Sequence, residues 1–530
     1  MRLGEAMRSR PLGLLMLAGL LIAACGGGTS TSNQQSGPKH GGTLTVAVGI
    51  DPDTLDPAAQ TTTTVQQMVL MITEPLLAYD EKNTLKPVLA EKWDAAADGL
   101  SYTFTLRQGV KFSDGEPFNA AAVKFSLDRM LNPATFKTQP GVLRVIKSTD
   151  VVDDSHVKIS LKTPFPPFLG AMTQAVAAII APNSVSQAPN TPALIQKPVG
   201  TGPYVFKERV NGDHVTFDKN PSYWGSKPNY DAQVYKVVPD AATREALVKA
   251  GQADVSYLPP ANDLPALQQS QDLKVILGPS DRTIFMSINT PGKFQPLLQK
   301  PAVREALNYA VNKDAIVKNA LFGAATPLDA PMSKALFGYC SVGKYDYNPE
   351  KAKQMLKDAG AEGMKIKVIS PQGRYIGDYQ VAQAVAGDLR KVGLQVELAN
   401  PSDWPTYLSR MVNVPPDQAT ADLHLLGWAP SFLDAAQQFQ IMTPDNFPPK
   451  GLNTSYYSNQ SVTDLVTKAN GETDSNQRKQ DYCSAGKQVW KDAPWIFLYN
   501  QKNPIVTTSK VTGIYGLANE QFVTSWASPA

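Results

Sequence analysis

The chain has 530 residues, of which 42% are hydrophobic and 18% charged, and a chain of this length has room for about three domains. Its 50 lysines and arginines nearly balance 47 acidic residues, so the formal charge of +3 gives no sign of a nucleic-acid partner. Aromatic residues make up 8% of the chain, which excludes a collagen-like or fully disordered protein. Four histidines and three cysteines leave little material for a metal or thiol enzyme. We therefore expect a large, nearly neutral globular protein.

The first 24 residues have the pattern of a secretory signal. Three arginines lie within residues 1–10, and residues 11–24 are almost purely apolar. As a helix this apolar stretch would extend about 21 Å, too short for a bilayer core about 30 Å thick. It ends in Ile22-Ala-Ala-Cys25, which resembles the bacterial lipobox, where a signal peptidase cuts before a cysteine that is then lipidated. Residues 25–40 have no aliphatic side chain and predict a flexible tether. We expect an exported protein that Cys25 anchors to the outer face of the cell membrane.

The two remaining cysteines, Cys340 and Cys483, are expected to form a disulfide. An exported protein meets an oxidising compartment, where a single pair of cysteines is more often a bridge than a catalytic or metal site. Such a bridge would close a loop of about 140 residues and constrain the unfolded chain by about 4–5 kcal/mol in the entropic model. The alternative is two separate buried thiols.

The first half of the chain is rich in alternating, β-branched segments, which predict strands. Helices are expected where apolar residues recur at helical spacing, and Asn119 is placed to cap one of them. In chain order we expect a strand at 43–48, a helix at 64–73, a strand at 100–110, a helix at 120–130, a strand at 151–161 and a β-rich stretch over 200–238.

After about residue 281, strands and helices alternate. In chain order we expect a strand at 284–288, helices at 302–317 and 349–359, a strand at 365–369, a helix at 379–392, and strands at 394–398 and 495–500. This alternation favours an α/β unit with a partly parallel sheet. No repeat of 20–50 residues is evident, which disfavours solenoids and propellers.

Five groups of short motifs follow one another along most of the chain. They are 87–93 (PVLAEKW) with 98–115, 200–204 (GTGPY) with 220–224 (NPSYW), 303–307 (VREAL) with 312–314 (NKD), 347–352 (YNPEKA), and 492–499 (DAPWIFLY). Together they resemble the extracellular solute-binding proteins, family 5, of peptide-type ABC importers, a family that includes oligopeptide, dipeptide and nickel binders. Each motif alone is weak, but five in the order of the family are specific.

The resemblance implies an α/β, two-lobed fold of the periplasmic-binding-protein type (type II), with an extra domain inserted in the first lobe. The expected organisation is a signal peptide at 1–24, a tether at 25–40, lobe I at 41–74, 198–280 and 501–530, the inserted domain at 75–197, and lobe II at 281–500. The implied function is non-catalytic capture of a peptide or peptide-like solute between closing lobes. The expected partners are a membrane permease with its ATPase, and the resemblance implies a monomer with no cofactor.

The segment 425–435 (LLGWAPSFLDA) resembles the family segment in which a Gly-Trp strand precedes two acids. In peptide-binding relatives this segment pairs with the peptide main chain, and the first acid holds the ligand ammonium. Gly427 and Ala429 are therefore expected to offer backbone hydrogen bonds, and Trp428 to lie in the cleft. Here Ser431 replaces the first acid and only the second, Asp434, is present. Either Asp434 takes that role, or the ligand is not a plain peptide.

Other ligand contacts are expected outside that segment. Gly373-Arg-Tyr375 resembles a motif found in part of the family, so Arg374 and Tyr375 are candidates to hold a ligand carboxylate. The alternative is that Arg374 bridges to Asp378. Asn289 and Asn453 are candidate amide contacts, and for both the alternative is a structural role in a loop.

Several alternatives to peptide capture remain open at this point. The chain contains no His-Glu-x-x-His and no Gly-x-Ser-x-Gly motif, which disfavours a secreted hydrolase. Within the same fold the solute could instead be nickel, haem or a sugar, and nickel would favour His424, three residues before Gly427. A receptor that presents its closed form to a sensor partner fits the sequence equally well.

Overall fold

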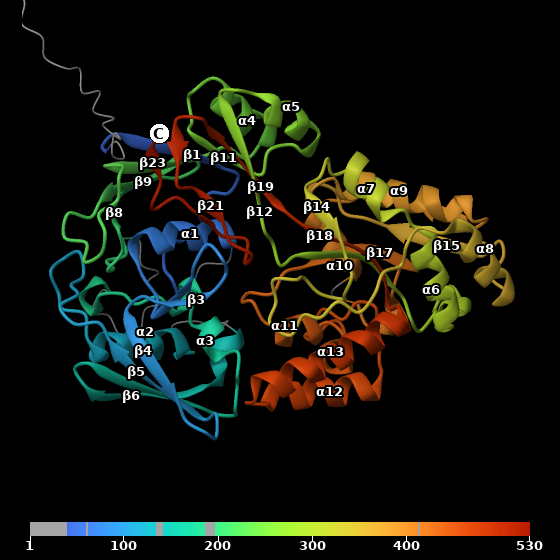
Figure 1. The fold of residues 1–530 in the computed structure, drawn as a ribbon, viewed down its shortest axis with the longest axis horizontal. Helices are drawn as coiled ribbons and strands as arrows, with labels where there is room; N and C mark the ends of the chain where they lie inside the picture. The colour runs from blue at the N-terminus through green and yellow to red at the C-terminus, as the bar shows by residue number, and fades with distance from the viewer. Residues whose placement is uncertain (1–39, 53, 60–61, 134–140, 186–196, 412–413) are drawn as a thin grey trace, which may run out of the picture. The chain divides into compact units, whose positions relative to one another are not determined.

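The computed structural model describes residues 40–52, 54–59, 62–133, 141–185, 197–411 and 414–530 (Figure 1). The expected signal peptide, the lipidation site Cys25 and all but the last residue of the expected tether lie outside these ranges. Within the described ranges, no helix is both long and apolar enough to cross a membrane.

A seven-stranded mixed sheet contains strands from the beginning, the middle and the end of the chain. In pairing order its strands are β12 (Leu273–Gly278), β19 (Asn503–Thr508), β11 (Val255–Tyr257), β1 (Thr43–Val48), β10 (Ala232–Val237), β9 (His214–Lys219) and β8 (Tyr204–Val210). Strand β1 runs parallel to β10 and β11, and the other pairs are antiparallel. Helix α1 (Thr63–Ile72) packs on this sheet through Met68, Val69 and Ile72, and α4 (Ala241–Lys249) and α5 (Leu264–Gln269) contact it as well. We call this part the first lobe.

A four-stranded antiparallel sheet is built from the chain between β1 and β8. Its strands, in pairing order, are β4 (Ala90–Ala95), β5 (Ser101–Leu106), β7 (His156–Leu161) and β6 (Ile146–Asp153). Helix α2 (Ala120–Leu131) covers it, and the Asn119 side chain caps α2 by accepting from the Ala122 amide at 3.1 Å. The hairpin β2 (Leu77–Tyr79) and β3 (Leu85–Pro87) and the short helix α3 (Phe168–Ala171) complete this part.

The single strand expected at 151–161 is wrong, because the chain turns back within it. Strand β6 ends at Asp153 and β7 begins at His156. The Asp153 carboxylate accepts from the Ser155 amide at 2.8 Å, which is a typical turn-stabilising contact. The alternating pattern continued across this tight turn, so periodicity alone did not separate the two strands.

A six-stranded mixed sheet is formed mainly by the last half of the chain. In pairing order its strands are β14 (Ala325–Pro327), β18 (Trp495–Gln501), β13 (Thr283–Ile288), β17 (Leu423–Trp428), β15 (Lys365–Ile369) and β16 (Gln395–Leu398). Only β15 pairs in parallel, with β16 and β17, so the sheet is partly parallel as expected. We call this part the second lobe.

Helices form hydrophobic cores with this six-stranded sheet on both of its faces (Figure 1). The helices of the first core are α6 (Pro301–Ala310), α7 (Lys313–Asn319), α8 (Pro349–Asp358) and α9 (Asp378–Lys391). Those of the second are α11 (Ala435–Gln440), α12 (Gln460–Gly471) and α13 (Ser475–Asp492), while α10 (Trp404–Met411) lies beside the two cores. The single helix expected at 302–317 is wrong, because Asn312 interrupts it and caps α7 by accepting from the Ala315 amide at 2.9 Å.

The two lobes are linked by two chain crossings. One runs from β12 into β13 and the other from β18 into β19. The C-terminal segment 511–530 carries the short pairs β20 (Val511–Thr512) with β23 (Ser528–Pro529) and β21 (Tyr515–Gly516) with β22 (Phe522–Val523). At the first crossing the Asp281 amide donates to the Ala518 carbonyl at 2.6 Å. The C-terminal segment therefore lies beside the crossing.

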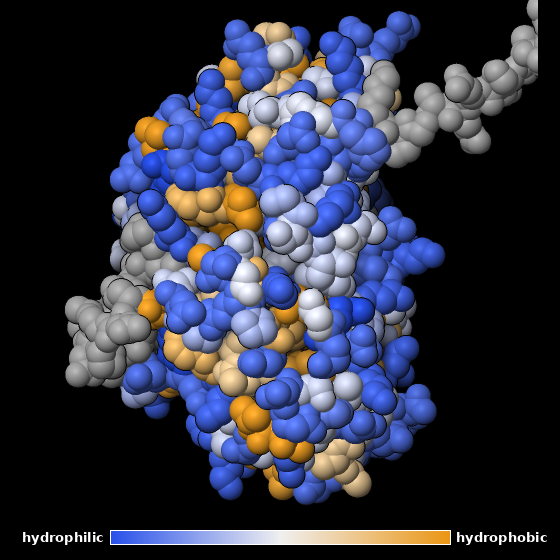
Figure 2. All heavy atoms as spheres, turned by 90° about the vertical axis from the view of Figure 1, so that its left-hand side faces the viewer, coloured by the Kyte–Doolittle hydropathy of each residue, from blue (hydrophilic) through white to orange (hydrophobic). Residues whose placement is uncertain are grey.

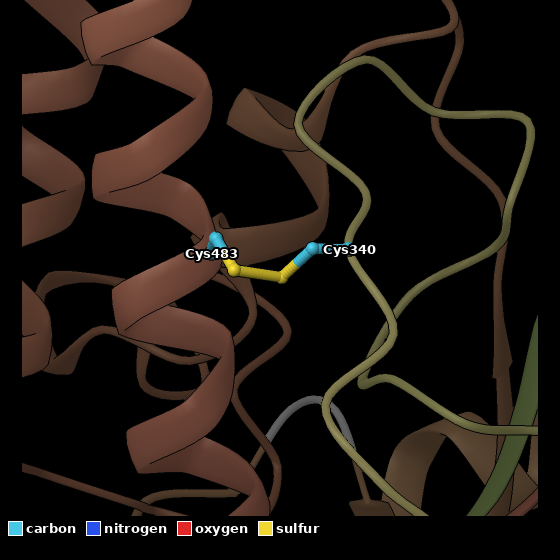
Figure 3. Close-up of a disulfide and its surroundings, with 2 residues drawn as sticks. All are labelled: Cys340 and Cys483. Atoms are coloured by element: carbon cyan, nitrogen blue, oxygen red, sulfur yellow. A yellow bond between two sulfur atoms is a disulfide. The ribbon is translucent and has the colours of Figure 1, made fainter.

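A disulfide joins Cys340 and Cys483 (Figure 3), with 5.6 Å between the two Cα atoms. Cys340 lies in an irregular segment that follows β14, and Cys483 lies on α13. The bridge therefore fixes a long loop of the second lobe to its second helical layer.

The face of the molecule in Figure 2 is mostly hydrophilic, with small hydrophobic patches between polar residues. Apart from the adjacent Val151 and Val152, the large exposed hydrophobic side chains of the described residues are widely spaced along the sequence, as Ile50, Val210 and Phe294 are. Such scattered residues are ordinary for a protein surface in contact with water.

Candidate ligand-binding site

Gly427 lies on β17, and other residues pack closely around it. Gly427 pairs with Ile284 of β13, and Trp428 pairs with Thr283. A Cβ atom at Gly427 would lie 2.5 Å from Ile284 Cδ1 and 2.7 Å from Tyr375 Cε1, so only glycine fits there without a shift. The Tyr375 hydroxyl donates to the Gly427 carbonyl at 3.2 Å. The predicted site residues Tyr375 and Gly427 are therefore in direct contact, although 52 residues separate them in sequence.

The register of β17 determines where its backbone amides point. The Asn289 amide donates to the Asp422 carbonyl at 2.9 Å, so this pair is a hydrogen-bonded position of the antiparallel ladder. Such positions alternate with non-hydrogen-bonded ones, and Gly427 therefore directs its N–H away from β13. Strand β15 pairs with β17 only at Leu423 and His424. The Gly427 amide thus faces an edge where no strand pairs among the described residues.

Residues 428–431 include the end of β17 and the chain that follows it, and two of them hydrogen-bond to Gln437. Trp428 is half-buried, and its indole N–H donates to the Gln437 carbonyl at 3.1 Å. The Ser431 amide donates to Gln437 Oε1 at 2.6 Å, whereas the Ser431 side chain is exposed. Ala429 lies half-buried between them. Sequence reasoning missed Gln437, because a glutamine on a short helix carries no recognisable motif.

Asp434 has a different role from the one considered for it. Its carboxylate forms a bidentate ion pair with Arg478 at 2.8 and 2.6 Å, and both side chains are buried. Asp434 also caps α11, because it accepts from the Ala436 amide at 2.9 Å. The expectation that Asp434 replaces the missing acid is therefore wrong: its charge is already neutralised inside the second lobe.

Arg374 lies in the loop after β15, and its side chain forms no ion pair with Asp378. The Asp378 carboxylate accepts from the backbone amides of Gly373, Arg374 and Tyr375 at 2.9–3.2 Å, which shapes the loop. The Arg374 guanidinium instead lies 5.2 Å from the Tyr375 ring centroid and 5.1 Å from that of Trp404. Among the residues that the structure describes, no carboxylate lies within ion-pair distance of Arg374. Its charge is available to a ligand.

Arg374 lines a cavity of about 360 Å³ where the two lobes meet. Arg282 and Glu520 face this cavity and form an ion pair with each other, with Arg282 Nε 2.7 Å from Glu520 Oε1. Burial would raise the pKa of Glu520, but the Arg282 guanidinium outweighs burial and holds that pKa below its usual value. A third arginine, Arg244, donates to four backbone carbonyls. Of the three arginines, Arg374 is thus the one best placed to meet an anionic group of a solute.

The two candidate asparagines lie away from this region. Asn453 is fully buried, donates to the carbonyls of Thr443 and Tyr457, and accepts from the Ser455 hydroxyl at 2.9 Å, so it holds its own loop. Asn289 follows the far end of β13, six residues beyond Thr283, a separation of about 20 Å along a strand. Neither asparagine is placed to contact a solute at Gly427.

His424 is buried within the second lobe. Its Nε2 lies 2.7 Å from the Thr454 hydroxyl, and burial lowers its pKa to about 3, so the ring is neutral. In the described part of the chain, no group of three His, Cys, Asp or Glu side chains is arranged to hold a metal ion. The structure therefore gives His424 a packing role.

Comparison with known proteins identifies the family. The model of "Bacterial extracellular solute-binding proteins, family 5 Middle" matches residues 84–447. The chain belongs to this family. A family 5 protein of this kind is the solute-binding component of an ABC importer, and its fold is two-lobed with an inserted domain, as the motifs implied.

Three relatives illustrate the range of solutes in family 5. The glutathione-binding protein GsiB of Pectobacterium atrosepticum is 32% identical over 479 residues, covering 90% of this chain and 92% of GsiB. The Helicobacter pylori binding protein DppA, in complex with the peptide STSA, is 26% identical with a TM-score of 0.73, covering 93% of this chain and 98% of DppA. NikZ of Campylobacter jejuni, in complex with Ni(L-His), is 25% identical with a TM-score of 0.75, covering 90% and 97%.

Proposed function

We propose that this family 5 protein captures a small peptide-like solute, with glutathione as the first candidate, and delivers it to a membrane permease. The observation that carries this proposal is the juxtaposition of a free guanidinium and an unpaired strand edge. Arg374 adjoins Tyr375, which contacts Gly427, and the Gly427 amide points away from β13. A peptide-like solute carries carboxylates and amides, which are the groups that such an arrangement binds. The GsiB relatives support glutathione in particular.

Each predicted contact has a distinct role in this proposal. Arg374 pairs with a solute carboxylate, and its contact with Tyr375 orients the guanidinium. The amides of Gly427 and Ala429 hydrogen-bond the solute main chain, and Trp428 forms one side of the site. Ser431 carries no charge. It therefore does not hold the amino group of the solute, as an acidic residue at this position would.

The proposal also covers the oligomeric state, the location and the domain boundaries of the protein. We infer that the protein is a monomer without enzymatic activity, anchored outside the cytoplasm through a lipid on Cys25. We place lobe I at 41–74, 198–280 and 501–530, the inserted domain at 75–197 and lobe II at 281–500. Sheet membership supports these boundaries. The strands of each sheet fall within these ranges, apart from the last residue of β18.

Isothermal titration calorimetry tests the proposal. The mature protein is titrated with glutathione, with trialanine and with the nickel–histidine complex. We expect binding of glutathione or trialanine, and a loss of about 1.5–3 kcal/mol in Arg374→Gln, or roughly 10- to 150-fold in affinity. The matched control is Arg410→Gln, an exposed arginine on α10 that should bind like the wild type. Equal affinities of Arg374→Gln and wild type, or binding of the nickel complex alone, would contradict the proposal.

A further inference from the structure

A second cavity, of about 300 Å³, lies on the first-lobe side and contains no residue of the second lobe's sheet. One wall is a face of α1, where Gln67, Leu70 and Met71 follow one another at helical spacing. Another wall is the C-terminal segment 515–526, which contacts α1 where the Ser525 hydroxyl lies 3.2 Å from Met71 Sδ. Tyr79 lines the cavity, and its hydroxyl accepts from the Leu433 amide at 3.4 Å, two residues beyond Ser431. The cavity therefore borders the segment that we propose to hold the solute.

Most of the cavity wall is apolar or aromatic. The hydrophobic part includes Leu70, Met71, Trp224, Leu517, Phe522 and Trp526. Trp526 is 37% exposed, so part of its ring is accessible to solvent. Apolar walls with a few placed polar groups are typical of small-molecule sites.

The polar groups in the wall differ in whether they have partners. Glu74 accepts from Tyr223 at 2.7 Å and from Trp224 and Thr201 at 2.8 Å, so its carboxylate is fully engaged. Gln67 is only 5% exposed, yet neither its side-chain nitrogen nor its oxygen has a hydrogen-bond partner among the described residues. Asn519 Oδ1 is also buried and without a partner in that part of the chain. Buried polar groups in native proteins are nearly always hydrogen-bonded.

We propose that this cavity binds an uncharged, partly apolar group that carries an amide, namely the side chain and adjoining amide of one residue of a peptide-like solute. The identification of the solute as peptide-like rests on the proposed function above. The NH2 group of Gln67 can donate to the carbonyl of a second amide, and its carbonyl oxygen can accept from the N–H of that amide. A charged group is disfavoured, because Glu74 is already engaged and an apolar wall does not solvate an ion.

The experiment uses a probe that combines these features, N-acetyl-phenylalaninamide. Trp224 and Trp526 line the cavity, so tryptophan fluorescence of the mature protein reports binding. We expect a saturable change, at least tenfold weaker binding to Gln67→Leu, and a smaller signal in Trp526→Phe. The matched control is Gln380→Leu, an exposed glutamine on α9, which should bind like the wild type.

A second measurement needs no variant. N-acetyl-phenylalanine, which has a free carboxylate in place of one amide, should bind the wild type at least tenfold more weakly than the neutral probe. An absence of saturable binding, equal affinity in Gln67→Leu, or equal affinity for the two probes would overturn the assignment. If glutathione binds in calorimetry while the probe does not, only this inference fails. If the probe binds while no peptide or glutathione does, the cavity is supported and the proposed function fails.

Discussion

The hydroxyl of Tyr375 donates to the carbonyl of Gly427, and the Tyr375 ring fills the space that a side chain at position 427 would need. This contact joins the loop that carries Arg374 to the strand whose amides face the proposed solute. It connects the part of the site that recognises charge with the part that recognises main chain.

Gly427→Ala tests this contact. The added methyl group would lie within 2.7 Å of Ile284 and Tyr375, and such overpacking costs about 1–3 kcal/mol. We expect a lower midpoint of thermal unfolding and at least tenfold weaker solute binding in calorimetry. The control is Gly387→Ala on α9, where an added Cβ meets nothing within 4 Å, so stability should rise by about 1 kcal/mol. Unchanged binding in Gly427→Ala would argue against a solute at this edge.

Ser431→Asp tests the position of the missing acid. An aspartate at this exposed position would offer a carboxylate to a solute ammonium. We expect improved binding of trialanine and no improvement for N-acetyl-trialanine, measured by calorimetry. Equal or weaker binding of trialanine would count against our placement of this segment in the site.

Asp434→Asn tests whether the Asp434–Arg478 pair is structural. The variant leaves a buried guanidinium without its carboxylate, which costs about 3–5 kcal/mol. We expect a large drop in the urea midpoint, with the ratio of affinities for trialanine and N-acetyl-trialanine unchanged. Asp445→Asn, an exposed aspartate, serves as the control and should keep wild-type stability. A change in that ratio would return Asp434 to the solute site.

Cys340→Ser tests the disulfide. Loss of the bridge frees a loop of the second lobe, so the unfolding midpoint under oxidising conditions should fall. We expect the same fall in Cys483→Ser, and no change in the order of preferred solutes. Under reducing conditions wild type and variants should unfold alike. Equal midpoints under oxidising conditions, or two free thiols at these positions in the native protein, would rule the bridge out.

His424 should make the protein less stable in acid. Burial lowers its folded pKa to about 3 from 6.5, so below pH 6.5 the unfolded chain binds the proton first and stability falls as pH decreases. At pH 5 this amounts to about 2 kcal/mol relative to neutral pH. Urea unfolding at pH 7 and pH 5 should show a smaller loss in His424→Gln than in the wild type. An equal loss in His424→Gln and the wild type would contradict the prediction.

Local pattern predicted six elements of the second lobe within one residue, namely β13, α8, β15, α9, β16 and β18, but it predicted none of the helices α10 to α13. Strand β15, helix α9 and strand β18 have strong periodicity and clear ends, such as Gly393, which has a positive φ after α9. Errors arose where a short polar turn broke a continuing pattern. Asn312 ends one helix and caps the next, and at Asp153 a strand turns back.

The site was predictable only where a motif marked it. Gly427 and Arg374 lie in motifs, but Arg478 lies 44 residues from Asp434 and Glu520 lies 238 residues from Arg282. No spacing in the sequence brings such partners together, because long-range pairing is decided by how the sheets and helices pack. The same reason explains why the free amide of Gln67 could not be recognised before the C-terminal segment was placed against α1.

The most direct test of the central claim is mass spectrometry of the molecule released from the purified mature protein. We predict one peptide-like molecule per protein, carrying at least one carboxylate and one amide, released chemically unchanged, with much less of it recovered from Arg374→Gln. Recovery of a sugar, a haem or a metal complex in its place, or of a hydrolysed product, would contradict the account.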